Sequence, residues 1–168
     1  SDSLFIATSS GIGQWNFTAN AWENPITTED GLPDSFIGDV FWASNTLYVA
    51  SLSGMTQYIP TTGASTTLKQ SDGLLGNSVA SFGSYTTTNQ DTWLIAVHDA
   101  GLGERPGLSV VNISLNTVVS THRFDQLPSN IVTSVTADYG GVHIATDSGS
   151  LTHYNGLTDQ FVAGISRA

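Results

Sequence analysis

The sequence predicts an all-β protein, a β-propeller of about four blades, and three observations lead to that prediction. One phrase recurs three times without a gap, beginning at Leu32, Leu74 and Leu127, with spacings of 42 and 53 residues. Short runs of Val, Ile, Thr, Tyr and Phe alternate with Gly, Asn, Asp and Ser, which is typical of strands and turns. Helical periodicity is almost absent. Strand-rich repeats of this period are typical of propeller blades, each built from a four-stranded antiparallel sheet.

The recurring phrase predicts the innermost strand of a blade and the crossing that leads into it. Its copies span residues 32–40, 74–82 and 127–135, and an Asp-Gly pair precedes the first two. Because Gly and Pro interrupt strands, the Asp-Gly-Leu-Pro stretch suits the passage between neighbouring blades. No copy precedes the first outer strands, so the first blade is expected to lack its innermost strand.

The second strand of each blade is predicted from a short apolar element. Its four copies are 4–8, 47–51, 93–97 and 142–146. The fourth position is alanine in every copy, which allows a neighbouring sheet to approach closely; these residues are Ala7, Ala50, Ala96 and Ala145. The second position is bulkier and suits filling between blades; it holds Phe5, Tyr48, Leu94 and His143.

The two outer strands complete each predicted blade. The third strand opens with a glycine suited to a tight turn, and its copies begin at Gly11, Gly54, Gly107 and Gly149. The fourth strand is weaker. The predicted blades span about 4–26, 32–70, 74–124 and 127–165, in a single propeller module covering residues 1–168.

Composition excludes several classes of function. The chain has 168 residues, no cysteine, 14 acidic residues against 4 Lys plus Arg, and a net charge of −10. Disulfides and thiolate metal sites are therefore excluded. Four cations are also too few to bind the phosphates of a nucleic acid or to attach the chain to an anionic membrane surface. Charged residues make up only 11% of the chain, so its polar surface is mostly uncharged. We interpret this composition as that of an extracellular or periplasmic protein.

These motifs resemble the two-component regulator propeller repeat. The matching stretches are Asp30-Gly-Leu-Pro33, Leu47-Tyr-Val-Ala-Ser51 and Gly54-Met-Thr-Gln-Tyr58. Partial matches occur at Asp72-Gly-Leu-Leu75 and at Leu127-Pro128. The resemblance implies a propeller that serves as a sensor region outside the cytoplasm for small ligands such as oligosaccharides. Propellers of that family commonly have more blades than this chain supplies.

The incomplete first blade leaves three arrangements open. The chain is a fragment of a larger ring, or it closes a four-bladed ring, or two copies join as half-rings in a homodimer. The missing strand leaves an open sheet edge, which a partner chain or another segment is expected to cover.

The candidate ligand-binding residues fall into three groups. Asp39, Ser81 and Ser134 share one position of the innermost strand and are expected to face the central channel, either as ligands to water or a hydrated cation or as solvated lining. Asp34, Asn77 and Asn130 are expected near the channel mouth, where they suit sugar hydroxyls or simply form turns. Glu104 and Arg105 stand in an insertion, 99–107, in the third blade.

No cofactor or metal site is predicted. The four histidines, His98, His122, His143 and His153, lack metal-binding spacing, and we interpret them as structural. The three glutamates stand in different local contexts and no nucleophile elbow occurs. We therefore predict a non-catalytic ligand- or partner-binding propeller, with carbohydrate as the preferred ligand. A structural oligomerisation module and a glycoside hydrolase with paired carboxylates remain as alternatives.

Overall fold

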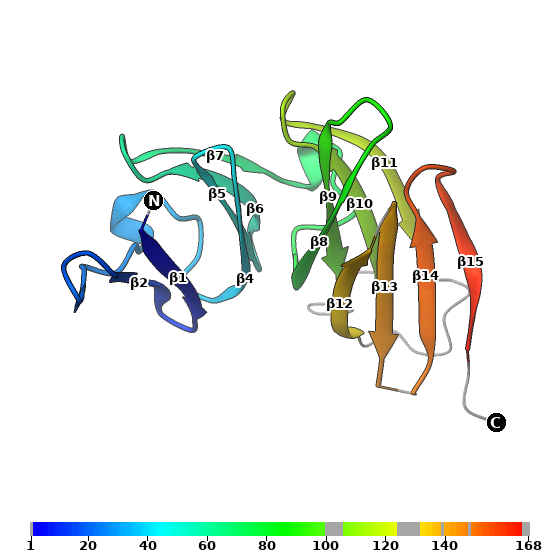
Figure 1. Ribbon diagram of the computed structural model, residues 1–168, viewed down its shortest axis with the longest axis horizontal. Coiled ribbons are helices and arrows are strands. Elements are labelled where there is room, and N and C mark those ends of the chain that lie inside the picture. The colour runs from blue at the N-terminus through cyan, green and yellow to red at the C-terminus, as the bar shows by residue number, and fades with distance from the viewer. Residues whose placement is uncertain (1, 100–105, 124–131, 139, 148, 166–168) are drawn as a thin grey trace.

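The computed structural model describes residues 2–99, 106–123, 132–138, 140–147 and 149–165 (Figure 1). Within these residues, strands form four antiparallel sheets that follow one another along the chain, as the propeller prediction requires. The inner strands β4 (Ile37–Ala43), β8 (Ser81–Thr86) and β12 (Val132–Asp138) contact one another in that order. The sheets therefore stand as blades around these three strands.

Each sheet is a simple meander. The first contains β1 (Ser3–Thr8), β2 (Gly11–Asn16) and β3 (Ala21–Trp22). The second adds β5 (Thr46–Ser51), β6 (Gly54–Ile59) and β7 (Ala64–Leu68) to β4. The third adds β9 (Thr92–His98), β10 (Gly107–Asn112) and β11 (Thr117–Arg123) to β8. The fourth adds β13 (Gly141–Thr146), β14 (Leu151–Asn155) and β15 (Gln160–Ile165) to β12.

The first sheet lacks an innermost strand, as the repeat predicted. In the described part of the chain it has three strands, whereas each of the others has four. A shallow groove lies between β1 and β4, and the rings of Phe5 and Trp42 stack in it with centroids 5.4 Å apart. The edge of β1 is thus left without an inner neighbour.

The Asp-Gly pairs between blades have a clear local role. Each closes a short 3-10 turn, η1 (Thr28–Asp30) or η2 (Gln70–Asp72). The Asp30 carboxylate accepts the N–H of Thr27 at 2.9 Å, and Asp72 accepts that of Lys69 at 2.9 Å. The glycines that follow have φ of 99° and 107°, a left-handed conformation that favours glycine. The chain can therefore turn sharply as it leaves one blade for the next.

Alternate residues of the second strand face opposite neighbours. In β5, Leu47 and Val49 pack with Ile12 of the first sheet, whereas Tyr48 and Ala50 pack with Phe82 of the third. This is the period-two alternation of a strand that is covered on both faces. The core is therefore divided into three layers, each lying between consecutive blades.

The predicted alignment of the third blade was wrong by one residue. In the second sheet, Asp39 pairs with Ala50. In the third sheet, Ser81 stands at the position of Asp39, but it pairs with Val97 and not with Ala96, which the sequence had aligned with Ala50. Ala96 and Leu94 consequently face the preceding blade, and Ile95 takes the position that Tyr48 holds. Because side chains alternate between the two faces of a strand, a shift of one residue in register moves every side chain to the opposite face. The pairing of strands across the sheet sets this register.

Within the described residues, the two end blades each leave one face uncovered. On the first sheet, Leu4, Ile6 and Trp22 are 47%, 39% and 61% exposed. On the fourth, Leu151 and Val162 are 39% and 49% exposed. We call these the first free face and the last free face. No helix among the described residues is long and apolar enough to cross a membrane.

Candidate functional site

The structure brings the predicted channel residues Asp39 and Ser81 together. Asp39 Oδ2 accepts hydrogen bonds from Ser81 Oγ and from the N–H of Phe82, both at 2.9 Å. Its Oδ1 accepts the N–H of Val40 at 2.8 Å. The carboxylate therefore links β4 to β8 across the boundary between two blades. This role is structural, and binding of a ligand by the same carboxylate stays a prediction.

Ser134 occupies the equivalent position on β12. It pairs with Ala145 as Asp39 pairs with Ala50, and its side chain is exposed. The three predicted channel residues thus share one register across the inner strands.

At the predicted mouth, Asp34 and Asn77 are held in place by local hydrogen bonds. Asp34 Oδ1 accepts the N–H of Phe36 at 3.0 Å, and its Oδ2 accepts from Ser53 Oγ at 3.0 Å. Asn77 Oδ1 accepts the N–H of Gln70 at 2.9 Å. Both side chains remain partly exposed. They are therefore oriented polar groups at the start of consecutive blades.

Three predicted site residues, Asn130, Glu104 and Arg105, lie outside the described residues.

The strands on either side of the insertion are joined by His98, which is completely buried. Its Nδ1 lies 2.9 Å from the carbonyl oxygen of Ser78, an atom that can only accept, so Nδ1 carries the hydrogen. Ser109 Oγ accepts the N–H of Leu75 and forms a hydrogen bond of 2.8 Å with His98 Nε2. Both ring nitrogens are thereby hydrogen-bonded, which agrees with the predicted structural role.

A second network joins the third and fourth blades. Asp159 accepts hydrogen bonds from Tyr154 at 2.5 Å, His122 at 2.8 Å and Ser120 at 3.0 Å. Burial acts to raise the pKa of Asp159, but the bonds from Tyr154, His122 and Ser120 outweigh it and hold this pKa below its ordinary value. Burial, together with the bond to Asp159, raises the pKa of Tyr154. The three donors therefore stabilise an ionised carboxylate at this boundary.

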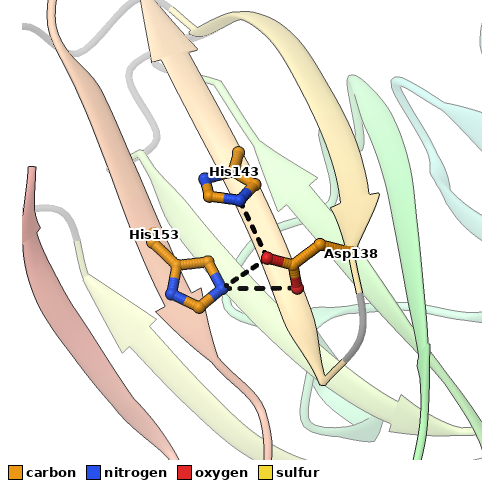
Figure 2. Close-up of side chains that lie close together, drawn as sticks. All are labelled: Asp138, His143 and His153. Carbon is orange, nitrogen blue, oxygen red and sulfur yellow. Dashed lines mark hydrogen bonds and ion pairs between the residues drawn. The ribbon is translucent and has the colours of Figure 1, made fainter.

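One group of metal-ligating side chains among the described residues was not predicted from the sequence. Asp138, His143 and His153 converge on the fourth sheet, and their ligand atoms all lie within 4.8 Å of one another (Figure 2). Asp138 Oδ2 lies 2.8 Å from His143 Nε2 and 3.2 Å from His153 Nε2. We call these three residues the His–Asp cluster.

Aligned repeats contained a signal for this cluster. His143 and His153 are directly opposite one another across β13 and β14. The same two positions pair Phe5 with Gln14 and Tyr48 with Gln57 in the first two blades. If these aligned positions are treated as neighbours across two strands, the repeats predict that the two imidazoles lie together. A metal motif defined by spacing along the chain does not reveal this cluster, because a hairpin turn separates the two histidines.

Comparisons with known proteins support the fold. No protein-family model matches the chain, and no curated protein matches it. Two structures of the extracellular domain of BT4673 from B. thetaiotaomicron, described as a one component and as a hybrid two component system, align with TM-scores of 0.71 and 0.67 at 16% and 21% identity. BamB from Moraxella catarrhalis aligns with a TM-score of 0.66 at 14% identity.

These alignments cover nearly all of this chain but only part of the similar structures. The chain is covered at 100%, 99% and 99%, whereas 22% and 21% of the BT4673 chains and 47% of BamB are covered. The fold is therefore that of β-propeller blades, and the chain spans about a fifth of the BT4673 structures. At the level of the fold, the likeness to these extracellular domains agrees with the propeller-repeat resemblance found in the sequence.

Proposed function

We propose that the chain is a ligand- or partner-binding section of an extracellular β-propeller, with a sensor-like and non-catalytic role. Support comes from the similar structures, which are described as extracellular domains of signalling systems. The acidic and lysine-poor composition is typical of such a setting. Because a fold hosts many functions, the proposal depends on the site rather than on the likeness alone.

The protein hydrogen bonds that orient Asp34 and Asn77 are the observation that carries this proposal. Each oxygen of an ionised carboxylate offers about two lone pairs, and within the described part of the chain each Asp34 oxygen accepts from one protein donor. One acceptor position per oxygen therefore remains for a ligand. The protein donors also fix the direction of the carboxylate, which lowers the entropy cost of binding.

Carbohydrate is the ligand class that suits these groups. A neutral sugar supplies hydroxyls that donate to a carboxylate and exchange hydrogen bonds with an amide. An anionic ligand is disfavoured because the chain has a net charge of −10. We accordingly propose a neutral oligosaccharide as the ligand bound at this mouth.

A glycan array screened with the purified chain tests the proposal. Affinity for the glycans that bind is then measured for the wild type and for Asp34→Ala and Asn77→Ala. We expect each substitution to weaken binding by about 10-fold, because one oriented polar contact is removed. Asp91→Ala, a change of the same charge at an exposed turn, serves as the control and should leave affinity unchanged.

Two results would reject this proposal. The first is an array on which no neutral glycan is retained. The second is binding that Asp34→Ala and Asn77→Ala leave intact while both variants remain folded. Turnover of chromogenic aryl glycosides would instead favour the hydrolase alternative.

A second candidate function is assembly into a larger ring, and the two free faces favour it. Apolar side chains that an adjacent blade covers elsewhere are exposed at Leu4, Ile6 and Leu151. The equivalents of Leu4 and Ile6 on the second sheet are Leu47 and Val49, which are 1% and 0% exposed beneath the first sheet. We propose that a second copy of the chain covers these faces.

A further inference from the structure

The fourth sheet places three ligand side chains on one face. Asp138 ends β12, and His143 follows on β13, with Thr136 opposite it. His153 lies directly opposite His143 on β14. Residues two apart on a strand share a face, so Asp138 projects on the same side as both histidines. Three strands thus supply one group each.

The local packing leaves room for the rings to approach. The ring centroids of His143 and His153 are 4.6 Å apart, at an interplanar angle of 32°. A Cβ added at Gly141 would lie 2.0 Å from the carbonyl oxygen of Tyr154 and 2.9 Å from Nε2 of His153, so a larger residue would clash with the backbone of β14 and with this imidazole. The glycine that opens β13 therefore permits the His153 ring to reach the Asp138 carboxylate.

The separations between donor atoms fit a first-row metal ion. Nitrogen and oxygen ligands bind Zn²⁺ at about 2.0–2.2 Å, so tetrahedral ligand atoms lie about 3.3–3.6 Å apart. His153 Nε2 lies 3.2 Å and 3.4 Å from the two Asp138 oxygens. His143 Nε2 lies 2.8 Å from Oδ2, which a small side-chain rotation would widen. Both imidazoles direct a ring nitrogen toward the Asp138 carboxylate (Figure 2).

The cluster also has an open side. The side chains of His143, His153 and Asp138 are 37%, 25% and 36% exposed. They lie on the last free face, because Val142, Ile144 and Tyr154 face the third blade. An ion held by three protein groups would therefore keep a coordination position directed away from the fourth sheet.

We propose that Asp138, His143 and His153 form a binding site for a divalent first-row metal ion, with Zn²⁺ as the best fit. Two imidazoles and one carboxylate are a donor set that Zn²⁺ accepts, and three protein ligands with one exchangeable position are typical of open zinc sites. This site is separate from the proposed sugar-binding mouth and does not depend on it.

Titration of the metal-free chain with Zn²⁺ alone, followed by calorimetry, tests the site. We expect one equivalent to bind, and Asp138→Asn, His143→Gln and His153→Gln each to weaken binding by more than about 10-fold. His122→Gln is the matched control, because His122 contacts a carboxylate, Asp159, but belongs to no three-residue cluster among the described residues. It should leave Zn²⁺ affinity unchanged.

Co²⁺ gives a second readout that does not depend on heat. Tetrahedral coordination by two imidazoles and a carboxylate gives intense visible absorption, whereas hexahydrated Co²⁺ absorbs weakly. We expect the intense bands in the wild type and in His122→Gln, and their loss in His143→Gln. Thermal melting without metal verifies that each variant is folded.

Three outcomes would overturn the proposal. One is the absence of Zn²⁺ binding at millimolar concentration. Another is binding that the three cluster substitutions leave unchanged, which would assign the ion to other carboxylates of this acidic chain. Equal weakening by His122→Gln and by the cluster variants would also contradict a site built from these three residues.

Discussion

Tyr85 shows how a single buried hydroxyl links two blades. Its ring is 3% exposed and lies against Gly156, where an added Cβ would be 2.3 Å from a ring carbon. Its hydroxyl donates to the carbonyl of Gly156 at 3.1 Å. Burial, with a smaller effect of Asp159, raises the pKa of Tyr85 to about 12.

This shift predicts a loss of stability in alkali. A group with a raised pKa in the folded state stabilises that state fully below its unfolded pKa, and the contribution falls as pH rises through the folded pKa. The ordinary value is 10.0 and the folded value about 12, so the loss falls between these values. We expect Tyr85→Phe to be less stable near neutral pH by about 1 kcal/mol, since a hydrogen bond is removed. Above pH 10 this deficit should shrink.

Urea unfolding across that pH range measures the effect. Other buried tyrosines contribute to the alkaline loss, so only the difference between Tyr85→Phe and the wild type is informative. Thr121→Ala, an exposed change on β11, should show a difference that is constant with pH. A Tyr85→Phe deficit that stayed constant up to about pH 12 would contradict the assigned pKa.

Among the elements, β4 and β8 are joined by the Asp39 carboxylate. Two donors of β8, Ser81 Oγ and the N–H of Phe82, bond to the same oxygen. A charged acceptor makes stronger hydrogen bonds than a neutral one. The carboxylate therefore stabilises the boundary between the second and third blades beyond the apolar packing there.

Substituting Asp39 should destabilise this boundary. We expect Asp39→Ala to lower the free energy of unfolding by about 1–3 kcal/mol, because the partly buried N–H of Phe82 loses its acceptor. Ser81→Ala should cost less, since that N–H keeps the carboxylate. Ser134→Ala, at the equivalent exposed position of β12, should change stability by less than about 0.5 kcal/mol. Equal costs at Ser81 and Asp39, measured by urea unfolding, would show that the N–H contact contributes nothing.

The whole molecule presents two free faces that correspond to opposite sides of a blade boundary. Ile6 on the first free face has the register of Val49, which is buried by the first sheet. Leu151 on the last free face has the register of Met55, which is buried by the third sheet. At each boundary between blades inside the chain, a face equivalent to the first free face packs against a face equivalent to the last free face. Two copies therefore have complementary surfaces for joining as half-rings.

Light scattering over a hundredfold concentration range measures this assembly. We expect the wild type to form a dimer, and Ile6→Glu to shift it to a monomer by placing a charge within the contact. Thr66→Glu, an exposed change of the same charge on β7, should leave the dimer intact. A monomeric wild type at every concentration would reject assembly of copies, as would an Ile6→Glu variant that still dimerised.

Much of the architecture could be predicted from local patterns. The repeated phrase placed β4 and β8 and showed that the first sheet would lack its inner strand. The Asp-Gly pairs marked the crossings because an aspartate cap and a left-handed glycine are both local requirements. In the candidate site, the common register of Asp39, Ser81 and Ser134 followed from the same repeat.

The sequence by itself determined the alternation of strands and turns, the order of the sheets and the incomplete first blade. These depend on residues close together in the chain. The tertiary structure decided the register of β9, the bonds that occupy Asp39, and the meeting of Asp138, His143 and His153. It also decided which sheet faces are uncovered. Each of these depends on contacts across strands or blades, and no local pattern contains the geometry of such contacts.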